Sequence, residues 1–318
     1  MELNSLRPYL EKIKDIFKNE SDRYKAHEKC QNVLKDMSLD KEVLYDIIRQ
    51  NLDDADFLRK KRHYSTLAMK IYENEDFSFV LNIFPPLPNK DLNISFQSIH
   101  HHGSLILSTV SAFGPGYKSI LFKKGFEINP SNLITKMSIE KEYQNEVHDV
   151  SFIDAFQPHI VFYPNDFSGT YALWSNRKKS AKEIAKKIGL INSFKKPLAK
   201  IINLIGLSRI FGLNVAEYYD FYVKNNEVIA MKEREAYNSI GSNENFIQNI
   251  CCFIQKTGFD DLDFLNRVIQ KNDTRDSTKK YLTMLIENQK VTSLFHEGHL
   301  NIPKVNLHRN EILGALNN

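Results

Sequence analysis

The chain has 318 residues, of which 42% are hydrophobic and 26% are charged. This balance excludes an intrinsically disordered chain and a bundle of membrane helices. Lys and Arg number 43 and Asp and Glu 39, so the net charge is only +4, which argues against a dedicated nucleic-acid-binding protein. A single core seldom grows beyond roughly 250–300 residues, so we expect two domains or one elaborated domain.

The sequence carries no pattern for export or for membrane insertion. The first residues, MELNSLRPYLEKIKD, lack the basic and apolar regions of a signal peptide. The most apolar stretch, Ile201–Leu213, is shorter than the ~20 residues that a membrane span needs. The cysteines Cys30, Cys251 and Cys252 form no CxxC pair and no disulfide framework. We therefore expect a cytoplasmic protein that binds neither membranes nor nucleic acid.

The first 62 residues show the helical period. Leu6, Leu10 and Ile13 follow one another at spacings of three and four, which indicates an amphipathic helix. Asp40 precedes the apolar segment KEVLYDIIRQN and is a typical helix N-cap. Residues 1–62 are thus predicted to be an N-terminal helical segment.

Short β-rich runs replace the helical pattern between Tyr64 and Trp174. About nine such runs, among them FSFVLNIF, SLILSTVSAF and PHIVFYP, are separated by turn material such as PPLPNKD and the GPG of Gly114–Gly116. Strands that follow one another without an intervening helix are typical of an antiparallel sandwich or barrel. We assign residues 63–178 to an antiparallel β-barrel.

From Lys179 onward the helical period returns. NFIQNICCFIQKTGF and TKKYLTMLIENQK are examples, and Gly258 stands where a helix would end on a left-handed residue. Cys251 and Cys252 lie within the first of these segments and are expected to be buried helix residues. Residues 179–318 are therefore predicted to be a C-terminal helical region. The predicted fold class is α+β, with a central jelly-roll-type β-barrel flanked by N-terminal helices and a larger C-terminal helical region.

A cluster of histidines is the sharpest local feature. In SIHHHG, His100 and His102 would point to the same face of an extended chain while His101 points away. Two imidazoles from one strand supply two positions of a facial metal site, and a third ligand must come from a neighbouring strand. The candidates are His148 in NEVHDVSF and His159 in FQPHIVFYP.

These residues resemble the motifs of the cupin superfamily. The order IHHHG, strand, GPG turn, VHDV and final IVFYP strand is most similar to the cysteine-dioxygenase-like thiol dioxygenases over residues 62–175. This resemblance implies that His100, His102 and His148 hold Fe(II). It also implies catalytic roles for Tyr163, as the counterpart of an active-site tyrosine, and for His159, as the counterpart of a histidine beside the ligands.

The chain departs both from the general cupin motif, which has a Glu after the second histidine, and from the thiol dioxygenases. No Glu follows the second histidine within LILSTV, which fits a site of three histidines and disfavours one of three histidines and a glutamate. The strand YSTLAMKIY lacks the family's carboxylate-binding Arg, and the nearest basic residues are Arg59, Arg62 and Lys70. The sequence therefore supports the metal site better than it supports a thiol substrate.

The resemblance favours Fe(II), but histidine ligands suit other ions, so zinc, nickel and manganese are alternatives. We expect a metal-dependent oxygenase that acts on a small polar molecule with O2, with a basic residue near 59–70 holding any acidic group. Two other hypotheses stand beside it: a non-catalytic cupin that binds a ligand or scaffolds a partner, and a zinc hydrolase or isomerase on the same histidines. The flanking helices could form a lid or a dimer surface, so a homodimer is also expected.

Other motifs carry less weight. FHEGHLN, residues 295–301, places two histidines three apart, whereas the zinc protease motif HExxH places them four apart. The short basic runs at Arg59–His63 and Asn176–Lys187 read as solvated surfaces. The sequence contains no Walker loop, GxGxxG or GxSxG motif, so nucleotide binding and serine hydrolysis have no support in the sequence.

Overall fold

A computed structural model describes residues 4–60, 66–86, 93–95, 97–177, 220–231, 242–271, 273–293 and 307–317. Its elements in chain order are α1 (Leu6–Asn19), α2 (Arg23–Leu39), α3 (Lys41–Asp53), α4 (Ala55–Leu58), β1 (Leu67–Glu73), β2 (Ser78–Phe84), β3 (Ile94–Ser95), β4 (Leu105–Phe113), β5 (Tyr117–Phe122), β6 (Glu127–Ile128), β7 (Thr135–Lys136), β8 (Ile139–Asn145), β9 (Val150–Ile153), β10 (His159–Phe162), β11 (Ser168–Asn176), β12 (Asp220–Lys224), β13 (Glu227–Met231), α7 (Asn243–Thr257), α8 (Leu262–Gln270), α9 (Asp276–Ile286), β14 (Leu307–His308) and α10 (Arg309–Leu316).

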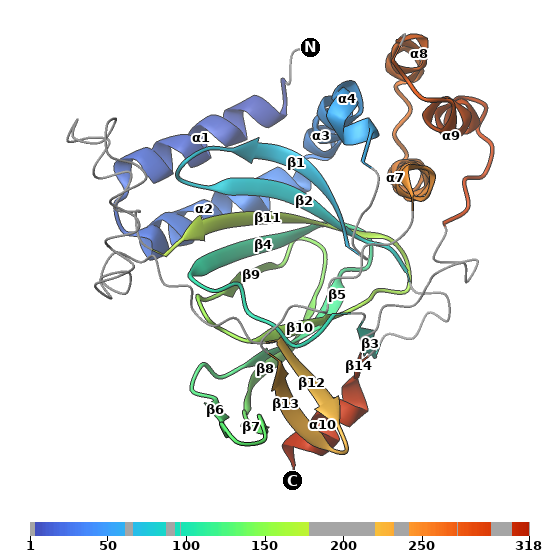
Figure 1. Cartoon of the computed structure of the whole chain (residues 1–318). Coiled ribbons are helices and arrows are strands. Elements are labelled where there is room, and N and C mark those ends of the chain that lie inside the picture. The colour runs from blue at the N-terminus through green and yellow to red at the C-terminus, as the bar shows by residue number, and fades with distance from the viewer. Residues whose placement is uncertain are drawn as a thin grey trace, which may run out of the picture.

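Helices cover one face of a five-stranded antiparallel sheet. The strand order is β1-β2-β11-β4-β9, and Figure 1 shows α1 and α2 lying along this sheet with α3 and α7 beside them. Alternate residues of the strands, such as Phe79, Leu81 and Tyr171, point into a core that they share with these helices. The histidine of α2, His27, is fully buried there and contacts the hydroxyls of Ser108 and Ser175 with its two ring nitrogens.

A three-stranded antiparallel sheet, β10-β5-β8, faces the first sheet. Its outer face carries Ile120, Phe122, Ile160 and Phe162, which form a second core with the β12–β13 hairpin and α10. Figure 1 shows this hairpin and α10 below the sandwich, on the side opposite to α1 and α2. The architecture is therefore layered: helices, a five-stranded sheet, a three-stranded sheet, and a hairpin with one helix.

The remaining face of each sheet packs against the other sheet. Leu107, Leu121, Ile153 and Ala172 form one inner cluster, while Phe84, Tyr117, Val161 and Tyr163 form another. Both sheets are antiparallel, and the structure confirms the predicted α+β class. The sheets do not close into a barrel, however, so the predicted β-barrel is corrected to an open two-sheet sandwich.

The predicted C-terminal helical region needs a second correction. The region predicted to be helical contains Asp220–Lys224, which is a strand paired with Glu227–Met231 across a two-residue turn. Asn225 and Asn226 both have positive φ, which is the backbone of the tight hairpin turn that asparagine tolerates. The apolar strip Ile201–Leu213 lies outside the described residues.

Several local predictions are confirmed. Asp40 caps α3 by accepting a hydrogen bond from the backbone N–H of Glu42 at 3.0 Å. Gly258 ends α7 in the left-handed region, at φ 72°. Cys251 and Cys252 are buried within α7 and form no disulfide. Among the described helices, none has the length and apolar character to cross a membrane.

Candidate metal centre

Three histidines converge where the two sheets meet. The ring nitrogens of His100, His102 and His159 that could bind an ion all lie within 4.8 Å of one another. Two nitrogens bonded to one ion at about 2.1 Å each are at most about 4.2 Å apart. Small ring rotations therefore suffice to bring the three donor atoms onto a single ion.

The backbone brings these residues together by one strand pairing. His100 and His159 exchange two backbone hydrogen bonds, of 3.0 and 2.9 Å, in an isolated antiparallel bridge. His102 follows two residues after His100, just before β4 begins, and its ring centroid lies 4.4 Å from that of His159. The predicted convergence of His100 and His102 is confirmed, as is the separate direction of His101, which packs against Phe156. His101 is buried, with 3% of its surface exposed.

Backbone contacts fix the tautomer of two of the rings. His100 donates from Nδ1 to the carbonyl oxygen of Ser98 at 2.9 Å, and His159 donates from Nδ1 to that of Gln157 at 3.2 Å. Because a carbonyl oxygen only accepts, each Nδ1 carries the proton and each Nε2 keeps its lone pair. A backbone carbonyl on the remote ring nitrogen is the usual support of a metal-binding histidine. This donor set fits a divalent ion.

Burial keeps His159 in its neutral form. His159 is 2% exposed, and this burial together with the neighbouring His100 lowers the pKa of His159 well below its ordinary value. A histidine must be neutral to bind a metal. The low pKa of His159 therefore leaves its imidazole ready as a ligand at neutral pH.

A pocket of about 690 Å³ leads to the cluster and reaches it at His102. It is lined by the turn between β1 and β2, the start of β4 and the end of β11, and its described lining residues are Asn74, Glu75, Asp76, Phe77, Ser78, Val80, His102, Leu105, Trp174, Ser175 and Asn176. Trp174 stands edge-on to His102, with 4.3 Å between ring centroids. The size suits a small molecule, which could reach the half-buried His102 while His100 and His159 stay covered.

His148 lies elsewhere, and the predicted ligand set is corrected at this position. Its Nδ1 lies 3.0 Å from the hydroxyl of Ser38 in α2, and its backbone N–H donates to the carbonyl of Ser111. Ser111 is six residues beyond Leu105, or about 20 Å along β4 at 3.3 Å per residue. The structure thus groups His159, which we expected to be catalytic, with His100 and His102 in place of His148.

Tyr163 is also separated from the cluster. It is four residues beyond His159, on the same face of the chain but about 13 Å further along. Its ring is buried beside Phe84, and its hydroxyl lies 3.4 Å from that of Thr66. A catalytic role for Tyr163 stays a prediction that this placement does not favour.

Arg59 and Lys70, two of the basic residues expected to hold an acidic group, are not among the described residues that line the pocket. Arg59 pairs with Asp273 at 2.9 Å, and Lys70 pairs with Glu73 at 2.9 Å on the exposed side of β1. Arg62 lies outside the described residues, as do both histidines of FHEGHLN and most of the basic run after Asn176.

One signal in the sequence could have favoured His159 over His148. His159 precedes a run of apolar residues, IVFY, and the order histidine then apolar strand is typical of a side chain at the entrance of a buried strand. His148 instead stands among Glu146, Asp149 and other polar residues, as expected for a turn, and it adopts a positive φ of 70°.

Comparison with known proteins gives structural likeness only. No protein-family model matches the chain, and no curated protein sequence matches it. Among solved structures, TT1209 from Thermus thermophilus is 14% identical with a TM-score of 0.25, over 39% of this chain and 94% of TT1209. The cupin domain of Cnp3 from Schizosaccharomyces pombe is 9% identical with a TM-score of 0.24, over 42% of this chain and 78% of that domain.

A third similar structure is the cupin domain of an XRE-family transcriptional regulator from Enterobacter cloacae. It is 11% identical with a TM-score of 0.23, over 35% of this chain and 96% of that domain. The neighbours include cupin and double-stranded β-helix proteins. At these scores the likeness adds nothing to the argument about function, which rests on the histidine cluster and its pocket.

Proposed function

We propose that this chain is a cupin-type metalloenzyme in which His100, His102 and His159 hold one divalent ion. The observation that supports this most is the convergence of the three rings, two of them with Nδ1 bound to a backbone carbonyl. In both of these rings Nε2 is unprotonated, which is the form in which a histidine nitrogen binds a metal.

We further propose Fe(II) as the ion and oxygenation as the reaction. Fe(II) held by three neutral ligands supplies Lewis acidity and redox reactivity toward O2. The pocket admits a small molecule to His102. The burial of His100 and His159 excludes water from the far side of the site.

The charge of the pocket points to the class of substrate. Its described lining contains Glu75 and Asp76 and no Lys or Arg, and Asp76 is paired with Arg23 from α2. The described lining thus offers a substrate carboxylate no cationic partner, because Arg23 is engaged by Asp76. We therefore propose a neutral or cationic small molecule as the substrate, in place of the carboxylate that the resemblance to thiol dioxygenases implies.

Oxygen consumption tests the proposed reaction. Chelator-stripped protein would be loaded with Fe(II) under nitrogen and then mixed with aerated solutions of small amines, amino alcohols, sugars or carboxylates in an oxygen electrode. We expect O2 uptake with a neutral or cationic compound, and its loss in the His159→Ala variant. Tight zinc binding with no O2 uptake for any compound would overturn the oxygenase proposal and favour the zinc hydrolase or isomerase.

A further inference from the structure

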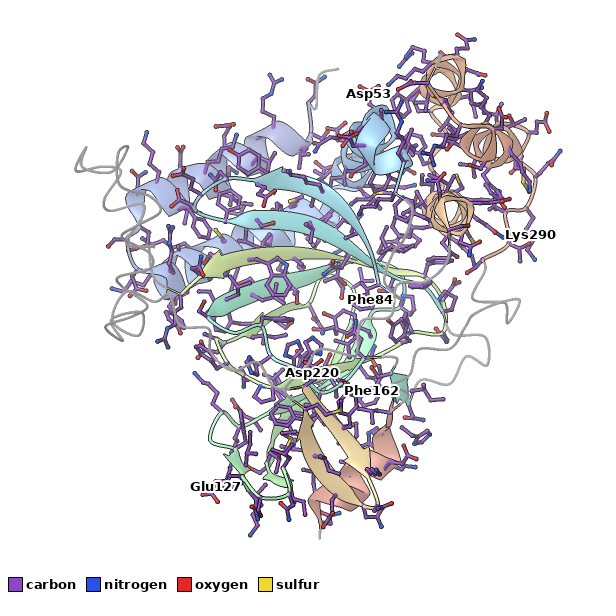
Figure 2. The ribbon with its side chains drawn as sticks, in the orientation of Figure 1. Asp53, Phe84, Glu127, Phe162, Asp220 and Lys290 are labelled. Carbon is purple, nitrogen blue, oxygen red and sulfur yellow. The ribbon has the colours of Figure 1, made fainter. Side chains whose placement is uncertain are left out.

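A buried carboxylate lies outside residues 63–178, which were predicted to form the barrel, but opposite a histidine of the cluster. Asp220 is the first residue of β12 and is 1% exposed. Figure 2 labels it at the end of β12 that lies against the sandwich. A carboxylate is costly to bury unless the surroundings compensate its charge, so the residues that the strands place around Asp220 matter.

The strand register fixes what stands opposite Asp220. The backbone N–H of Ile99 donates to the carbonyl of Phe221 at 3.1 Å, and that of Phe221 donates to the carbonyl of Ile99 at 2.8 Å. In an antiparallel pair, the next residue on one strand faces the previous residue on the other. His100 therefore stands opposite Asp220.

The other edge of the same short segment meets β10. His100 stands opposite His159 there, through the two backbone hydrogen bonds of their bridge. Residues directly opposite one another share a face of the sheet, with Cβ atoms about 4.5–5.5 Å apart. Asp220, His100 and His159 thus form one row across three neighbouring strands.

The face of that row is the face of the metal site. Ile99 and Phe221, the neighbours in the same register, are fully buried in the outer core with Ile160. Because side chains alternate along a strand, Asp220 and His100 point the opposite way, toward the inside of the sandwich. His100 stands between Asp220 and His159 in this row, so Asp220 is a direct cross-strand neighbour of His100 and not of His159.

We propose that Asp220 is a positioning residue of the metal site, whose carboxylate lies beside His100 and stabilises the ion held by the three histidines. This inference rests on the proposed metal function. Three neutral imidazoles leave the full charge of a divalent ion uncompensated in a buried place, where a negative charge nearby is felt strongly. Groups that act on a metal through its ligands typically change its affinity by 10–100-fold.

The test is a calorimetric titration of Zn(II) into the chelator-stripped full chain. Zinc serves as the probe because it binds without redox chemistry and reports affinity apart from activity. Asp220→Asn keeps the shape of the side chain and removes its charge, so we expect the Kd for zinc to rise about 10–100-fold with one site retained. Asp220→Glu restores the charge and should recover part of the affinity.

Asp46→Asn is the matched control, because Asp46 is another buried carboxylate with a purely structural setting. It accepts hydrogen bonds from the backbone N–H groups of Ser5 and Leu6 and pairs with Arg49. This control should lower the melting temperature and leave the Kd unchanged. If Asp220→Asn does not fold, the smaller Asp220→Ser provides the neutral variant.

The outcomes separate the two proposals. A wild-type chain that binds no zinc overturns the metal site itself. Wild-type binding that Asp220→Asn leaves within a factor of two overturns the role of Asp220 alone. A rise in Kd that Asp220→Glu fails to reduce at all also overturns it, because the effect would then not follow the charge.

Discussion

The buried histidines of this chain differ in what their two ring nitrogens contact. His27 places one nitrogen 2.8 Å from the hydroxyl of Ser108 and the other 3.0 Å from that of Ser175. Both nitrogens are thus used within the protein, and His27 joins α2 to β4 and β11. His100 and His159 instead each donate from Nδ1 to a backbone carbonyl. This difference is consistent with a structural role for His27 and with the proposed role of His100 and His159 as ligands.

His27 should make stability fall in mild acid. Burial, aided by the nearby charge of Arg23, lowers its pKa to about 3, against an ordinary value of about 6.5. Below pH 6.5 the unfolded chain therefore binds a proton at His27 that the folded chain does not bind. The stabilising effect is complete above pH 6.5 and is lost as the pH falls from there toward 3.

We expect the free energy of unfolding to fall by about 2 kcal/mol between pH 7 and pH 5 because of His27. Urea denaturation at both pH values measures this loss, and His27→Gln should lose about that much less than the wild type. Equal losses in the two proteins would contradict the buried neutral state of His27.

At the scale of elements, the sequence predicts what depends on near neighbours in the chain. The N-cap at Asp40, the end of α7 at Gly258 and the succession of strands between Tyr64 and Trp174 all follow from local patterns, and the structure confirms them. The convergence of His100 and His102 follows from their spacing of two residues in the same way.

The remaining features depend on pairings between distant segments. Whether His148 or His159 joins the pair is decided by the register between β10 and residues 99–100, which periodicity cannot give. The strand Asp220–Lys224 likewise forms because Phe221 pairs with Ile99, more than 100 positions earlier in the chain. Its aromatic run, YYDFYV, fits a strand as well as a helix, so only the pairing decides.

The turn between β4 and β5 depends on a glycine that the structure explains. Gly114 has φ +82°, and a Cβ atom placed on it would lie 2.0 Å from the backbone oxygen of Phe167. We expect Gly114→Ala to lower the free energy of unfolding by about 1–3 kcal/mol or more. Gly125→Ala is the control, since a Cβ at Gly125 meets no atom within 4 Å. Chemical denaturation of both variants measures the difference, and an unchanged Gly114→Ala protein would contradict this turn geometry.

At the scale of the whole molecule, the histidine cluster and Asp220 bring together segments from three parts of the chain. The short segment with His100 is held between β10 and β12, so the hairpin after residue 219 completes the sheet that carries the cluster. The same hairpin packs with α10 against β5 and β10. The described parts of the C-terminal region therefore belong to two places: α7 packs in the core of the five-stranded sheet, and β12, β13 and α10 cover the other sheet.

The metal content of the purified full chain tests the central claim most directly. We would measure it by mass spectrometry of the elements for the wild type, His159→Ala and His148→Ala, after loading with Fe(II) or Zn(II) and removal of free ions. His148→Ala is the matched control, because both variants remove one imidazole and His148 contacts Ser38 away from the cluster. The account predicts about one ion per chain in the wild type and in His148→Ala, and little or none in His159→Ala. An ion that His159→Ala retains and His148→Ala loses, or a wild type that binds none, would contradict it.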